Sequence, residues 1–276
     1  MKCTVTVDLF QILGMAMIAR IRVPRQLDSG IVVRPAESES EIAAANMLVF
    51  RNYVAEGYWD DDIEKLTNNI WLHSPFRDVF IATHNSDIVA TVSIVRDSGA
   101  GLPSDRFQPT WLDHFRRCGN RLAEVSALAI EKNRVELKNL SLFLMKYYMQ
   151  HAFYYTEVDR LVKACRPKHA DFYADILRFE KVGEIVPNDY ARRPSQLLSI
   201  DMIDAHRVLS DYYASDGMGQ RNFYHFLLVD KHPSTRFPKR TAYRSRLCDW
   251  AAYARLRHAM KHGRQLVAED TRLSVA

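Results

Sequence analysis

Cysteine is scarce in this sequence, and the spacing of the cysteines excludes two classes of protein. The four cysteines, Cys3, Cys118, Cys165 and Cys248, lie far apart and form no CxxC or CxxxH pair. Zinc sites and disulfide frameworks both need closely spaced or regularly paired cysteines. We therefore expect reduced thiols, no bound metal and a protein that works in the cytoplasm.

Long apolar runs are also missing. The one candidate for targeting or insertion, LFQILGMAMIA at residues 9–19, is too short to span a bilayer and lacks a small-residue cleavage pattern. Three readings of it stay open: a helix docked on the protein, a helix lying on the inner membrane, or a disordered start. The second reading predicts peripheral membrane contact.

The sequence does have enough apolar residues for one large core with an appendage. Its 276 residues are 47% hydrophobic. Lysine and arginine outnumber the acids 38 to 33, which gives a net charge of +5. This charge fits an acidic protein partner, an anionic membrane or nucleic acid, and its sign alone does not choose among them.

Apolar periodicity predicts a mixture of strands and helices. Residues 31–35 predict a strand, Ser38 predicts a helix N-cap, and residues 78–95 predict a hairpin. Gly, Ser and Pro residues predict a loop over 97–108. Further strands are expected at 121–130, 160–167, 179–186 and 195–201, and helices at 38–58, 60–72, 111–117, 135–157 and 168–178.

The same pattern divides the chain into three parts. Residues 1–30 form an N-terminal extension and residues 31–201 form the core. Residues 202–276 are helical in pattern and basic towards the end, and we expect them to pack on the core as a C-terminal extension.

One segment of the core resembles a superfamily motif. PKHADFYADILRFEKVGE, residues 167–184, carries an aromatic pair, Phe172 and Tyr173, before a turn at Arg178 and Phe179. It resembles the closing motif of the N-acetyltransferase-like (GNAT) superfamily, with arginine where glycine is usual. The resemblance implies an α/β (α+β) acyltransferase fold with a twisted mixed sheet of about seven strands, flanked by helices.

A second segment narrows the family. AEVSALAI, residues 123–130, is similar to a strand of the long-chain N-acyl amino acid (N-acyltyrosine) synthases, and more distantly to the E-x-S-R strand of acyl-homoserine lactone synthases. Glu124 and Ser126 match, whereas Ala127 stands where many relatives carry arginine. The segments FRNYVAEGYWDDD and DSGAGLPSD also resemble this family.

The resemblance implies a function. Both families take acyl groups from acyl carrier protein, so we expect a bacterial N-acyltransferase that moves a long-chain fatty acyl group from that carrier to the α-amine of an amino acid, with tyrosine as a candidate. The implied partners are the carrier and the amino acid, without nucleic acid. No bound cofactor is implied, because the acyl-carrier thioester is a co-substrate.

Glycine is absent where enzymes of this fold that use coenzyme A carry a glycine-rich turn for the pyrophosphate. The segment after Ile130, EKNRVELKNL, contains none. A carrier-protein thioester brings only one phosphodiester, and carrier proteins are acidic, so basic residues nearby are candidate contacts. Each has an ordinary solvated side chain as its alternative. The candidates are Lys132, Arg134, Arg166 and Lys168, with Arg116, Arg117, Arg121 and Lys138 as further counter-charges.

In this fold the strands before and after the long helix diverge, so the resemblance implies that residues 121–130 and 160–166 grip a pantetheine arm. Glu124 is an acid inside an apolar strand, where desolvation raises a carboxyl pKa, and we expect it to act as a base or to bind the acceptor ammonium. The alternative is a structural ion pair with Arg51 or Arg121. Backbone N–H groups of Ser126 and Ala127 are candidate oxyanion donors.

The resemblance assigns roles to other side chains. Tyr173 matches a tyrosine that protonates the leaving thiol, with a core aromatic as its alternative. Phe172 and His169 are candidate substrate contacts, with a surface histidine as the alternative for His169. Arg51 is expected to bind the acceptor carboxylate, unless it pairs with Asp60–Asp62.

Three other functions stay open: an acyl-homoserine lactone synthase-like enzyme, a CoA-dependent N-acetyltransferase, and a non-catalytic module that binds acyl carrier protein or lipid. Ala127 in place of arginine weighs against the first. The missing glycine-rich turn weighs against the second.

Overall fold

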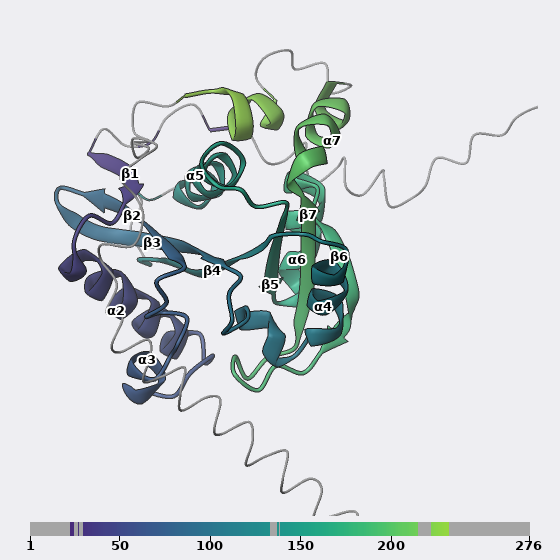
Figure 1. Cartoon of the computed structure of the whole chain (residues 1–276). Helices are drawn as coiled ribbons and strands as arrows, with labels where there is room; N and C mark the ends of the chain where they lie inside the picture. The colour runs from purple at the N-terminus through teal and green to yellow at the C-terminus, as the bar shows by residue number, and fades with distance from the viewer. Residues whose placement is uncertain are drawn as a thin grey trace, which may run out of the picture.

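The computed structural model describes residues 23–24, 27, 30–132, 137, 139–214 and 222–231, and its centre is a seven-stranded sheet (Figure 1). The strand order is β1-β2-β3-β4-β5-β7-β6, and all neighbours are antiparallel except β4 and β5. The expected mixed sheet is thus confirmed. The strands are β1 (Ile31–Pro35), β2 (Arg77–His84), β3 (Asp87–Arg96), β4 (Leu122–Ile130), β5 (Arg160–Cys165), β6 (Glu180–Val186) and β7 (Ser195–Asp201).

Helices cover both faces of the sheet. Helices α5, α6 and α7 bury their apolar side chains in one large core, whereas α2, α3 and α4 pack on the opposite face. Figure 1 shows α5 and α2 on opposite sides of the strands. The helices are α2 (Glu39–Ala55), α3 (Glu64–Thr67), the 3-10 turn η1 (Pro103–Arg106), α4 (Pro109–Arg117), α5 (Leu140–Tyr155), α6 (Pro167–Leu177), α7 (Met202–Ala214) and the π-helical turn η4 (His225–Val229).

Local chemistry explains several of these boundaries. The Ser38 hydroxyl accepts the backbone N–H of Glu41 at 3.2 Å, which confirms the predicted N-cap of α2. Asn85 and Ser86 have φ values of 51° and 76°, as a two-residue hairpin turn needs. Helix α6 begins at Pro167, whose missing N–H costs nothing at a first helical position.

The prediction of a helix over residues 60–72 was wrong, because only the four residues of α3 are helical there. The Asp62 carboxylate accepts the Glu64 N–H and starts the turn. The Asn69 side-chain oxygen then accepts the N–H groups of Trp71 and Leu72. Because side-chain acceptors take the backbone donors that a longer helix would use, the helix stops.

Arg178 stands at the end of α6, where glycine is usual, and it adopts the backbone conformation that glycine would have there. Its φ of 59° is the left-handed conformation that glycine adopts freely, at a cost of about 1 kcal/mol for another residue. The Arg178 guanidinium lies 4.0 Å over the ring of Tyr212 in α7. This cation–π contact offsets part of the strain.

The described C-terminal residues pack against α5. Lys146, which is 1% exposed, donates hydrogen bonds from Nζ to the carbonyl oxygens of Phe226 and Asp230. Burial lowers the pKa of Lys146 to about 8. The segment at 9–19 and the basic end of the chain lie outside the described residues. No helix in the described ranges is long and apolar enough to cross a membrane.

Gly183 in β6 fixes the approach of α4 to the sheet. Its φ is 65°, and a Cβ atom placed on it would lie 2.4 Å from Nε1 of Trp111 in α4. Gly119, which follows α4, has a φ of 83°, but nothing lies within 4 Å of the corresponding position. Both glycines therefore adopt a positive φ, but only Gly183 also has a neighbouring side chain that leaves no room for a Cβ atom.

Gly183→Ala should therefore lower the free energy of unfolding by roughly 3 kcal/mol, since it adds a steric clash to backbone strain. Gly119→Ala should cost only about 1 kcal/mol, because it adds the strain alone. Urea unfolding of the two variants measures both values. Equal losses would show that close packing of Trp111 on β6 does not constrain the fold.

Candidate active site

The two parallel strands of the sheet part soon after they begin. β4 and β5 pair only at Leu122–Arg160, Ala123–Leu161 and Glu124–Val162, whereas β5 stays paired with β7 as far as Cys165. The expected divergence is thus confirmed. We call residues 125–130 of β4 and 163–165 of β5 the splayed segments. Within the described residues, the edge of β4 that faces β5 has no strand partner along its splayed segment.

A β-bulge turns β4 where the splayed segment begins. Ser126 pairs with Ser93 and Ala129 pairs with Thr91, so β4 has one extra residue. Ala127 lies in this bulge with a φ of 53°. Val125 packs in the core beneath α5, but Ala127 and Ala129 pack with α2, because the bulge shifts the alternation by one residue. The predicted oxyanion role of the Ser126 and Ala127 N–H groups stays a prediction.

Glu124 is the last residue of β4 that pairs with β5, and its carboxyl group is buried. The residue is 3% exposed. The carboxylate accepts the Ser104 N–H at 2.9 Å and the Ser104 hydroxyl at 2.8 Å. Desolvation raises the pKa of Glu124 to about 7, although the two bonds from Ser104 act in the opposite direction. A carboxyl that titrates near neutral pH suits proton transfer.

The structural ion pair considered for Glu124 is not formed. Arg121 pairs with Asp159 and Glu157 at the surface instead. Arg51 is exposed on α2. The charged groups that act on the Glu124 pKa are Asp105, which raises it, and Lys163, which lowers it.

Helix α4 holds the turn that binds Glu124. Arg116 donates to Asp97 at 2.6 Å and to Asp105 at 2.6 Å, and Asp105 is the neighbour of Ser104 in η1. Arg116 therefore fixes the loop over 97–108, and its contact with a carrier protein stays a prediction. The loop prediction itself is confirmed, with η1 inside it.

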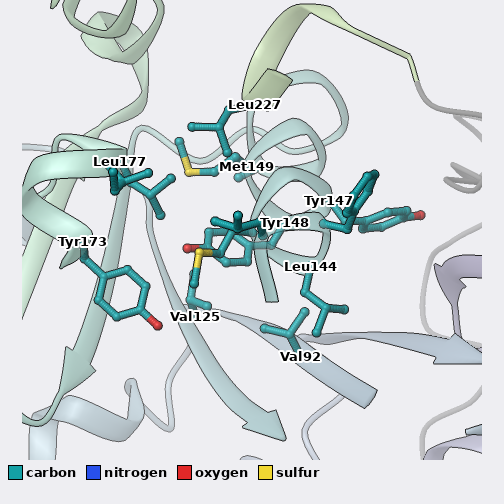
Figure 2. Close-up of a cluster of buried hydrophobic side chains, with 14 of the residues drawn as sticks. Val92, Val125, Leu144, Tyr147, Tyr148, Met149, Tyr173, Leu177 and Leu227 are labelled. Carbon is teal, nitrogen blue, oxygen red and sulfur yellow. The ribbon is translucent and has the colours of Figure 1, made fainter. Parts of the chain in front are cut away.

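Tyr173 and Tyr148 lie beside the splayed segments on the face covered by α5 and α6 (Figure 2). Phe172 contacts Tyr173 edge to face, with ring centroids 5.4 Å apart. The Tyr148 hydroxyl is buried and has no hydrogen-bond partner in the described ranges. Burial raises the pKa of Tyr148, and nearby Tyr173 and Cys165 raise it further. The roles predicted for Tyr173 and Phe172 stay predictions, and Tyr148 had no distinguishing sequence signal.

Tyr53 on α2 is a site residue that the sequence did not single out. Burial raises its pKa, and Glu124 and Tyr173 are among the groups that raise it further. Arg51 lies two residues earlier, about 200° around the helix, on its exposed side. Asp60 pairs with Arg192, so it does not hold Arg51. Carboxylate binding by Arg51 stays a prediction.

Tyr53 belongs to an aromatic cluster on the α2 face. We call it the α2 cluster. Tyr53 and Trp59 have centroids 4.9 Å apart, and Trp59 and Tyr190 have centroids 5.6 Å apart. Arg106 of η1 lies 4.5 Å over the Tyr190 ring. The cluster consists of Phe50, Tyr53, Tyr58, Trp59 and Tyr190.

Two of the predicted carrier contacts lie at the ends of the splayed strands. Lys132 follows β4 and Arg166 follows β5, and both form ion pairs with Glu56 at the end of α2. The Arg166 guanidinium also lies 4.5 Å over the Tyr58 ring. The two strand ends therefore carry positive charge around one carboxylate.

The remaining predicted contacts are near this position. Lys168 and His169 are exposed in the first turn of α6. Partial desolvation lowers the pKa of His169, and Lys168 and Arg166 lower it further, which favours the neutral imidazole. Arg134 lies outside the described residues. No three His, Cys, Asp or Glu side chains in the described part of the chain are arranged to hold a metal ion.

Comparison with known proteins agrees with this geometry. A mixed sheet whose parallel strands part beside a buried carboxyl is that of a GNAT-like acyltransferase. The N-acyl amino acid synthase FeeM family matches residues 44–201, more than half of the chain, and the chain belongs to this family. No curated protein sequence matches it.

The solved structure of an N-acyl amino acid synthase agrees with this family assignment. FeeM, an N-acyl amino acid synthase from uncultured soil microbes, is 27% identical, with a TM-score of 0.56 over 64% of this chain and 93% of FeeM. An acyl-CoA N-acyltransferase from Pseudomonas aeruginosa is 13% identical, with a TM-score of 0.43 over 63% and 99% of the two chains, too low to argue from. The implied fold and family are therefore confirmed.

Glu124→Gln should change how stability depends on pH. Because the folded-state pKa of about 7 exceeds the ordinary value of 4.5, the folded protein holds this proton more tightly than the unfolded chain. The free energy of unfolding of the wild-type protein should therefore fall as the pH rises from about 4.5 to about 7, and the variant should lack this fall. The difference between the two proteins should change by roughly 3 kcal/mol between pH 4 and pH 8.

Urea unfolding at several pH values measures this difference, and Glu180→Gln, at an exposed position of β6, is the matched control. A constant difference between wild type and Glu124→Gln would mean that Glu124 does not titrate near neutral pH.

Proposed function

We propose that this protein transfers a long-chain fatty acyl group from acyl carrier protein to the α-amine of an amino acid, forming an N-acyl amino acid. The observation that carries the proposal is the buried Glu124 carboxyl, with a pKa of about 7, where β4 and β5 part. An amine must lose a proton before it attacks a thioester, and a carboxyl that titrates near neutral pH can accept that proton. Membership of the FeeM family supports the same reaction.

The reaction proceeds by direct attack. Glu124 takes a proton from the acceptor ammonium, and the amine nitrogen forms a bond to the thioester carbonyl carbon. The backbone N–H groups of Ser126 and Ala127 stabilise the oxyanion. When the C–S bond breaks, its electron pair leaves with the sulfur, and Tyr173 donates a proton to the thiolate. The nitrogen releases its second proton to solvent water as the amide forms, and the proton held by Glu124 returns to Tyr173 through water.

The donor is acyl carrier protein rather than coenzyme A. Lys132, Arg166 and Lys168 lie where the splayed strands end, which suits one phosphodiester and an acidic partner surface. The segment after β4 has no glycine to cradle a pyrophosphate. Such a reaction belongs in the bacterial cytoplasm.

The acceptor is an aromatic amino acid, with tyrosine as the first candidate. The α2 cluster lies on the same face as Glu124, and its member Tyr53 is close enough for the Glu124 charge to raise its pKa. Aromatic rings pack favourably edge to face with other rings. Arg51 is the candidate for the acceptor carboxylate.

Purified protein with tyrosine should form N-acyltyrosine from palmitoyl carrier protein at least 10-fold faster than from palmitoyl coenzyme A, because only the carrier offers a protein surface to the basic residues. Mass spectrometry of the product measures both rates. Equal rates would contradict the carrier as donor. A requirement for S-adenosylmethionine would instead favour the homoserine lactone reaction.

Glu124→Gln should lower kcat by roughly 100-fold or more while leaving binding of the carrier unchanged, because it removes the base without touching the basic residues. The same mass-spectrometric assay measures the rate, and a pull-down measures binding. Glu180→Gln is the control and should keep wild-type activity. Carrier binding by a wild-type protein that forms no product would identify a non-catalytic module.

A further inference from the structure

Lys163 is a buried lysine on the splayed segment of β5. The residue is 6% exposed. Its ammonium lies 4.8 Å from the centroid of the Tyr173 ring. No ion pair or hydrogen bond joins it to another described residue, and its Nζ atom keeps some contact with solvent. The ammonium beside the Tyr173 ring is therefore free to stabilise a negative charge that develops next to it.

The position of Lys163 brings together the groups of the proposed reaction. Its side chain lies with Tyr173 on the face covered by α5 and α6, and Cys165 follows two residues later on the same strand. Its charge acts on Glu124 and lowers the pKa of the Cys165 thiol against the effect of burial. The Lys163 charge therefore acts on both the buried Glu124 carboxyl and a nearby thiol.

We propose that Lys163 stabilises the thiolate that leaves the acyl donor. This inference rests on the proposed function and adds a residue to it. As the C–S bond breaks, the sulfur takes the electron pair and the Lys163 ammonium offsets the new negative charge. Tyr173 gives its hydroxyl proton to the sulfur, and the ammonium beside the Tyr173 ring stabilises the phenolate until the proton held by Glu124 returns through water.

The acceptor carboxylate is the rival anion for Lys163. The aromatic rings proposed to bind the acceptor are in the α2 cluster, on the opposite face from Lys163 and Tyr173. The thiolate that leaves the acyl donor is therefore a better match for Lys163 than the acceptor carboxylate. The two roles differ in the kinetic constant that they change.

Lys163→Met tests the proposal with the palmitoyl carrier and tyrosine assay. We expect kcat to fall roughly 10- to 100-fold with the KM for tyrosine unchanged, because charge stabilisation is lost only in the transition state. The acid limb of the kcat profile should move to higher pH, because the cation that lowers the Glu124 pKa is gone. Lys163→Arg should recover part of the rate by restoring the positive charge.

Lys181→Met is the matched control, because Lys181 is an exposed lysine on β6, which β7 separates from β5, and it pairs with Asp171. It should keep wild-type kcat and pH profile. Circular dichroism and thermal unfolding check that each variant folds, and Lys163→Gln replaces Lys163→Met if the latter does not. A raised tyrosine KM with unchanged kcat, or no change in either, overturns the proposal. An inactive wild-type protein would instead overturn the proposed function.

Discussion

The parting of β4 and β5 after three residue pairs is the constraint on which the site depends. β5 cannot follow β4, because β7 holds it in register as far as Cys165. β4 leaves in the other direction, because the bulge at Ala127 moves its later side chains beneath α2. Backbone groups without strand partners are costly when dry. An extended pantetheine arm carries the amide groups that can satisfy them.

The Glu124 carboxyl is buried where β4 and β5 part, so it needs hydrogen-bond donors that hold it in place. Glu124 is held by both donors of Ser104, and the turn that carries Ser104 is held in place by the ion pairs of Arg116. This arrangement places the carboxyl without pairing it with a cation from the part of the chain that the structure describes. The pKa of Glu124 consequently stays close to neutrality, where a side chain can both accept and release a proton.

The two faces of the sheet supply different chemistry to the same point. Tyr53 and the rest of the α2 cluster approach Glu124 from one face. Tyr173, Tyr148 and Lys163 lie on the other face, beneath α5 and α6. The acceptor amine and the donor thioester can therefore come together only where β4 and β5 part. Lys132 and Arg166 mark the ends of that opening with positive charge.

The order of strands and helices followed from the sequence, because apolar periodicity, Ser38 and the hairpin turn are local signals. Glu124 could also be singled out, since an acid within an apolar strand is conspicuous. The short α3 could not be predicted, because Asn69 takes backbone donors from outside the helix. Tyr53, Tyr148 and Lys163 join the site only through the tertiary structure. Their significance comes from burial and from partners distant in sequence, and periodicity along the chain carries neither.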